Sequence, residues 1–69
     1  MSNTLAIYYF LKSEFKSDDS RWFSVREVAK HMNLSVDRTR KHLSLLVMGG
    51  DAETKIEGWF NVYRFRSGR

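Results

Sequence analysis

Two short helical segments joined by a tight turn constrain the fold of this chain more than any other feature of its sequence. Ser24 and Glu27 have the S-x-x-E spacing of a capping box, in which each side chain satisfies a backbone N–H at the start of a helix. Asn33 ends this first segment and tolerates the left-handed conformation in which many helices stop. Ser35 is then a good N-cap for the second helix. The spacing therefore predicts two helices, one directly after the other, within residues 24–48.

The apolar residues of both segments recur at the period of a helix that buries one face. The stripe of the first segment is Val25, Val28, Ala29 and Met32, and that of the second is Thr39, Leu43 and Leu46, extended by Val47. Asp37 stands in the first turn of the second helix, where the helix dipole favours an acidic side chain. Gly49-Gly50 stops this helix.

The residues before this pair of helices predict one further helix and a short strand. Asn3-Thr4 is a plausible N-cap for a helix over about 4–16, where Ile7, Leu11 and Phe15 fall on one stripe. A polar cluster at 17–20 ends that helix. Residues 21–23 are too few to form a strand alone, so we expect them to add to a sheet formed elsewhere.

The residues after the pair of helices predict a β-hairpin. From about 51 to 66 the pattern changes to the alternation of strands, with two alternating runs that meet at Glu57-Gly58. The faces of the second run are not cleanly apolar and polar, which leaves open a bulge or a register offset near Asn61.

The order of elements is helix, short strand, short helix, tight turn, helix and hairpin. It predicts an α+β fold of the winged-helix type, with three helices and a small antiparallel sheet, in one domain over 1–69. A chain of this size buries only roughly 60% of the surface that its unfolded form exposes, so nearly every large apolar side chain is needed for packing. Little room is then left for a ligand pocket, which needs roughly 300 Å³ or more.

The aromatic residues allow two interpretations. They could stack on bases, as aromatic side chains do in proteins that bind single-stranded nucleic acid, or they could fill the core of a small sheet. We favour the core for the set Trp22, Phe23, Trp59, Phe60, Tyr63 and Phe65. Tyr9, which lies off the main stripe of the first helix, is the aromatic residue we expect to be most exposed.

Several classes of function are not expected. The chain has no cysteine, and His31 and His42 stand far apart in the sequence, so neither a disulfide framework nor a metal site is predicted. No catalytic constellation or glycine-rich phosphate loop is present, and we expect no enzyme activity, cofactor or small-molecule substrate. The apolar run at 5–11 is far shorter than the roughly 20 residues of a membrane helix. No signal-peptide pattern surrounds it, so we expect a soluble, cytoplasmic protein.

Positive charge is concentrated in two parts of the chain. Residues 21–48 hold six basic against two acidic residues, and residues 60–69 hold three basic residues and no acidic one. The remaining segments, 1–20 and 49–59, are both net negative. Charge of one sign gathered on one region is typical of a polyanion-binding surface.

The segment 25–46, VREVAKHMNLSVDRTRKHLSLL, resembles the helix-turn-helix of bacterial repressors and activators. Ala29 stands where such motifs need a small residue at the helix crossing, Leu34 fills the turn, and Leu43 and Leu46 anchor the second helix. The motif covers roughly a third of the chain. In length and element order the chain is similar to the small regulators of fimbrial operons in enteric bacteria (the PapI and FaeA group) and to the N-terminal domain of CaiF- and GrlA-type regulators. This resemblance implies a transcriptional co-regulator that can require a larger DNA-binding partner.

In a motif of this kind the second helix enters the major groove with its N-terminal half facing the bases. Arg38 and Arg40 are the best candidates to bind guanine, since a guanidinium can hold O6 and N7 together. Lys41 and Ser44 are suited to phosphate, and Asp37 either accepts from a cytosine amine or orients a neighbouring arginine, which we favour.

The hairpin is expected to have a minor role, because the segment 53–58 is net negative and only Lys55 suits phosphate. Ser24 and Ser35 stand at helix N-termini, which favour anions, whereas Arg64 and Arg66 are expected nearer the body of the domain. The candidate DNA-binding residues are Ser24, Arg26, Ser35, Asp37, Arg38, Arg40, Lys41, Ser44 and Lys55.

The sequence thus predicts a DNA-binding transcription regulator with double-stranded DNA as its partner, and either a larger regulator or a second copy as a further partner. The alternative is a protein-interaction module that uses the same fold to bind another regulator, because a fold alone does not determine function. The acidic hairpin and the broad apolar face of the first helix favour that alternative.

Overall fold

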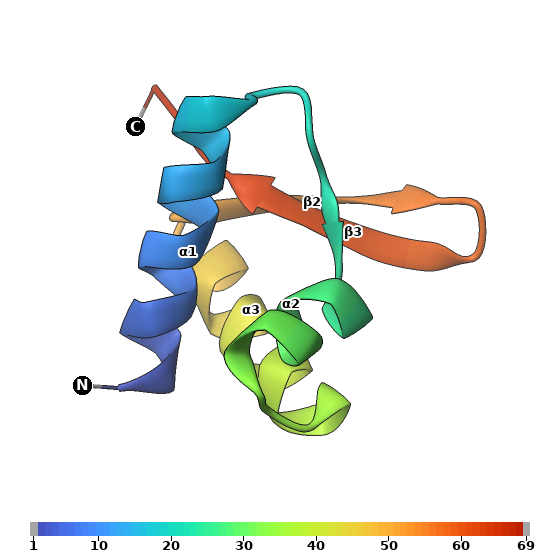
Figure 1. Ribbon diagram of the computed structural model, residues 1–69. Coiled ribbons are helices and arrows are strands. Elements are labelled where there is room, and N and C mark those ends of the chain that lie inside the picture. Colours follow the sequence, from blue (N-terminus) through green and yellow to red (C-terminus); the bar gives the residue numbers. More distant parts are fainter. Residues whose placement is uncertain (1, 69) are drawn as a thin grey trace.

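The computed structural model describes residues 2–68 and has the predicted α+β fold. The six elements, in chain order, are α1 (Asn3–Ser17), β1 (Phe23–Ser24), α2 (Val25–Met32), α3 (Val36–Met48), β2 (Ala52–Glu57) and β3 (Phe60–Phe65). The strands form one antiparallel sheet in the order β1-β3-β2 (Figure 1). The sequence of helices followed by a hairpin gives the winged-helix layout that the element order predicted.

The local signals at the helix ends are confirmed for α2, for α3 and for the C-terminal end of α1, and they are wrong for the start of α1. Both halves of the capping box form, with the Ser24 hydroxyl accepting from the Glu27 N–H and the Glu27 carboxylate accepting from the Ser24 N–H. Asn33 ends α2 in the left-handed conformation, at φ 57°. The N-cap of α1 is Ser2, whose hydroxyl accepts from the Leu5 N–H, and not the predicted Asn3-Thr4. The prediction failed because three adjacent residues, 2–4, are all good caps.

The hydrophobic core lies where the three helices meet the sheet. Its buried members come from every element, and the predicted stripes of α1, α2 and α3 all contribute. They are Ile7, Leu11, Phe23, Val28, Leu43, Leu46, Ala52 and Tyr63. At the end of the sheet away from the hairpin turn, the Phe65 ring packs edge-on against the Tyr8 ring, with 5.7 Å between centroids. This contact joins α1 to the last residue of β3.

The hairpin is regular along its whole length. Every residue of β2 is paired with one of β3, from Ala52 with Phe65 to Glu57 with Phe60, so the possible bulge or offset near Asn61 does not occur. Two residues, Gly58 and Trp59, make the turn. Gly58 has φ +65°, a conformation that favours glycine at this position of a tight hairpin turn. Figure 1 shows the turn projecting beyond the helices, away from α1.

This projection overturns part of the predicted core. Phe23 and Tyr63 are buried and Phe65 is partly buried, but Trp59 is 93% exposed and Phe60 68% exposed. Trp59 is therefore far more exposed than Tyr9, which is 52% exposed and was expected to be the most accessible aromatic residue. Alternation along a strand shows which residues share a face, but it does not show where the helices that cover that face end.

Candidate nucleic-acid interface

The exposed face of α3 carries most of the predicted DNA-binding residues. Thr39, Leu43 and Leu46 are buried and define the inner face of the helix. Because each residue advances about 100° around a helix, the opposite face carries Asp37, Lys41 and Ser44 near its centre and Arg40 at one edge, all of which are exposed. The structure thus brings these four predicted residues together on one surface.

Arg40 is held by an ion pair within this surface. Its Nη1 donates to the Asp37 Oδ1 at 3.0 Å, one helical turn away. This is the orienting contact that the sequence favoured for Asp37. Both side chains are largely exposed, so the pair contributes only about 0–1 kcal/mol and is easily exchanged for another partner.

Arg38 and Arg40 do not point to the same place. Two residues apart on a helix, they project about 200° from one another, so one flanks each side of the exposed face. Arg40 lies on the hairpin side, since it lines a pocket with hairpin residues. Arg38 lies on the side of His42, whose Nδ1 is 2.7 Å from the Thr4 Oγ1 of α1. The two arginines therefore extend from opposite edges of the exposed face.

The two N-cap serines are already engaged with their own helices. The Ser24 hydroxyl accepts from the Glu27 N–H at 3.1 Å, and the Ser35 hydroxyl accepts from the Arg38 N–H at 3.2 Å. Each hydroxyl keeps its proton free to donate to an anion. Their first contribution is to begin the helices in the right place, and any contact with phosphate comes in addition.

Lys55 is separated from the other candidates. Its ammonium group lies 4.4 Å from the centroid of the Trp22 ring and 3.7 Å from the Glu57 carboxylate. Its register partner is Val62, so it lies on the other face of the sheet from the Tyr63 side chain, which packs toward the helices. Lys55 therefore does not extend the surface of α3.

Arg64 lies against the body of the domain, as predicted. Its Nε donates to the Glu53 Oε1 at 2.8 Å and its Nη1 donates to the Asp19 carbonyl oxygen at 2.8 Å. The guanidinium also lies 4.3 Å from the centroid of the Trp22 ring. Trp22 is thus flanked by Arg64 and Lys55. Because Lys55 is the register partner of Val62, this cluster lies on the face of the sheet that bears Val62.

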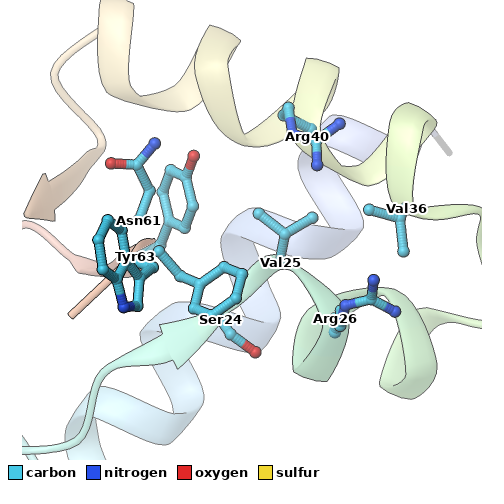
Figure 2. Close-up of a pocket in the computed structure, with 9 residues that line it drawn as sticks. Ser24, Val25, Arg26, Val36, Arg40, Asn61 and Tyr63 are labelled. Carbon is cyan, nitrogen blue, oxygen red and sulfur yellow. The ribbon is translucent and has the colours of Figure 1, made fainter. Parts of the chain in front are cut away.

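A pocket of about 460 Å³ opens between the N-terminal halves of α2 and α3 and the hairpin (Figure 2). The small size of the chain had predicted little room for one. The arginines on its wall are Arg26 of α2 and Arg40 of α3, and Figure 2 shows Val25 and Val36 between them. The full lining is Ser24, Val25, Arg26, Val36, Arg40, Trp59, Phe60, Asn61 and Tyr63.

Three of these lining residues were missed as site residues. Trp59, Phe60 and Asn61 were considered only as core residues or as a possible bulge. A signal was present, because two aromatic residues directly after a turn glycine stand at the tip of a hairpin. A hairpin tip is the part of a sheet least covered by helices.

Within residues 2–68, no three or more His, Cys, Asp and Glu side chains are grouped so that they could hold a metal ion. None of the helices described is both long and apolar enough to cross a membrane. No model of a known protein family matches the chain, and neither a curated protein nor a solved structure matches it.

Proposed function

We propose that this chain is a DNA-binding transcription regulator or co-regulator that reads the major groove with α3. The observation that carries the proposal is the exposed face of α3, which presents Asp37, Arg40, Lys41 and Ser44 along a helix whose other face is buried. The resemblance of the α2–α3 segment to bacterial helix-turn-helix regulators supports the same function. A helix presented in this way can enter a groove about 12 Å wide.

The side chains divide into two roles. Arg40 is the candidate for base recognition, because its fork can donate two hydrogen bonds to a guanine once it leaves Asp37. Lys41 and Ser44 lie beside it and suit phosphate oxygens. Arg38 and Arg26 flank the helix face on two sides and are suited to the two backbones of the groove.

The direct test is titration of the isotope-labelled protein with a random-sequence duplex, followed by NMR at low and at higher salt. We expect amide shifts at Ser24, at Ser35 and over 37–44. If three phosphates are contacted, affinity falls roughly 40-fold between 50 and 200 mM salt, because the release of counterions from the DNA is less favourable at higher salt.

Two matched variants sharpen this test. Lys41→Gln removes a charge from the α3 face, and Lys16→Gln removes an exposed charge from α1, outside the proposed interface. The first is expected to reduce the salt slope by about 1 and the second to leave it unchanged. Equal effects from both variants would show only a general attraction between a basic protein and DNA.

The alternative is a module that binds another protein. Large apolar side chains are exposed on the helices, including Leu5 and Tyr9 of α1 and Leu45 and Met48 of α3. If the amides of α3 do not move on addition of DNA while the protein stays folded, duplex DNA is not its direct ligand. A partner that binds with little dependence on salt would then support this alternative.

A further inference from the structure

The pocket beside α3 combines two features, and the first of them is used neither by the proposed duplex recognition nor by core packing. The first is a pair of consecutive aromatic residues, Trp59 and Phe60, which are 93% and 68% exposed. Neither ring contacts another aromatic ring or a cation in the part of the chain that the structure describes. Exposed rings at the mouth of a concavity are suited to stack on a flat apolar ligand.

The second feature is positive charge that is only partly neutralised. Arg26 has no ion pair with any residue in the range 2–68. Its neighbour Glu27 is directed elsewhere, to the Ser24 N–H at 3.0 Å and to Arg21 at 3.5 Å. Arg40 has one acidic partner, Asp37. The other acidic residue near the hairpin tip, Glu57, pairs with Lys55. The pocket therefore has an excess of positive charge.

The rest of the pocket wall adds hydrogen-bond donors that can bind an anion or the polar atoms of a ligand. The pocket includes the first residues of two helices, Val25 of α2 and Val36 of α3, where backbone N–H groups lack partners within the helix and the dipole is positive. Tyr63 is only 5% exposed, yet its hydroxyl has no hydrogen bond to another described residue and is not sealed from solvent. Asn61 supplies an amide on the same strand, and Figure 2 shows both polar groups at the pocket.

We propose that this pocket binds a single nucleotide. The base stacks on Trp59, with Phe60 also lining the pocket, and the phosphate is held between Arg26 and Arg40. Asn61 and Tyr63 then offer hydrogen bonds to the polar atoms at the edge of the base. The volume of about 460 Å³ lies in the range of roughly 300–1,000 Å³ that small-ligand sites occupy. A planar ring that carries a phosphate uses all these features together, whereas a phosphate alone leaves the rings exposed.

Such a nucleotide has two possible sources. One is a free mononucleotide, which would occupy Arg40 and compete with a duplex for it. The other is an unpaired nucleotide next to a duplex, which would add to the contacts of α3. Arg26 and Arg40 are shared with the proposed duplex interface, whereas the Trp59 ring lies outside the exposed face of α3, so stacking on Trp59 is tested separately from duplex recognition.

The test uses the full chain and the two indole N–H signals in its ¹H–¹⁵N NMR spectrum, assigned with Trp59→Phe. The probes are deoxyadenosine monophosphate, deoxyadenosine and inorganic phosphate. We expect the monophosphate to shift the Trp59 indole and the amides of 24–26 and 36–40 in a saturable way. Deoxyadenosine is expected to bind about tenfold more weakly, because it lacks the charge-assisted hydrogen bonds to the arginines.

Variants locate the site. Trp59→Ala is expected to weaken binding of the monophosphate about tenfold through lost stacking, and Arg26→Gln about tenfold through lost charge. Ile56→Ala is the matched control, because Ile56 is 75% exposed on the same hairpin and does not line the pocket. It should bind like the parent protein. All three positions are largely exposed, so the fold should be retained.

The proposal is overturned if inorganic phosphate binds as well as the monophosphate, or if Trp59→Ala binds like the control. It is also overturned if no probe, free or within DNA, shifts the signal of the Trp59 indole.

A blunt duplex and the same duplex with a single-stranded overhang separate the two sources of the nucleotide. Tighter binding of the overhang, lost in Trp59→Ala, identifies an unpaired nucleotide. Binding of the free monophosphate with no gain from the overhang identifies a free one. Blunt-duplex affinity tests the α3 proposal separately.

Discussion

Arg40 is the residue on which sequence selectivity is expected to depend. Its guanidinium lies on the exposed face of α3 and is free to exchange Asp37 for a guanine. Arg40→Ala is expected to weaken binding at a selected site by about 1–3 kcal/mol and to relax the preference at one base pair. Selection of preferred duplexes from a random pool, with each protein in turn, measures both effects. An unchanged preference in Arg40→Ala would move base recognition to another residue.

Asp37 is expected to reduce affinity for DNA while it stabilises the helix. It is acidic, lies in the first turn of α3 and forms an ion pair with Arg40. Asp37→Asn removes a charge that repels phosphate and releases Arg40, so affinity for a random duplex should rise. The same change should lower the free energy of unfolding by about 0.5 kcal/mol through the helix dipole. Fluorescence anisotropy and urea unfolding measure the two quantities, and weaker binding with unchanged stability would contradict this role.

How well single residues could be predicted depended on how local their interactions are. Ser24, Glu27 and Asn33 act on backbone groups within a few residues, and the structure confirms all three. Trp59 and Phe60 depend on which parts of the sheet the helices reach, which involves distant segments. The ion pair of Arg64 with Glu53 joins two strands and requires the hairpin register. Such contacts become visible only when the chain is folded.

At the scale of elements, the orientation of α3 depends on the turn that precedes it. Asn33 ends α2 at φ 57°, where a residue with a Cβ atom other than Asn or Asp costs roughly 1–2 kcal/mol. Asn33→Ala is therefore expected to lower the free energy of unfolding by about 1 kcal/mol. Asn33→Gly should remain close to the parent protein, because glycine adopts positive φ without strain.

Urea unfolding of both variants checks this prediction. Equal midpoints for Asn33→Ala and Asn33→Gly would show that the backbone conformation of the turn contributes little to stability.

The helices and their turn were predictable because caps and apolar stripes act within one element. The hairpin was predictable in position only, since the exposure of its tip depends on where α2 and α3 end.

At the scale of the whole molecule, the basic residues divide into two groups with different surroundings. Arg26, Arg38 and Lys41 have no acidic partner among residues 2–68 and lie around the start of α2 and the exposed face of α3. Arg64 instead joins β3 to β2 through Glu53 and to the loop after α1 through the Asp19 carbonyl. Positive net charge in the sequence could not separate these groups, because it does not show which charges are paired.

Arg64→Gln is therefore expected to affect stability and not DNA binding. The loss of its charged hydrogen bonds should lower the free energy of unfolding by about 2 kcal/mol. That is a large part of the roughly 3–10 kcal/mol expected for a domain of this size. Urea unfolding measures the loss, and anisotropy below the unfolding transition should give duplex affinity within twofold of the parent. The opposite result, unchanged stability with weakened binding, would place Arg64 in the DNA interface and move that interface from α3 toward the sheet.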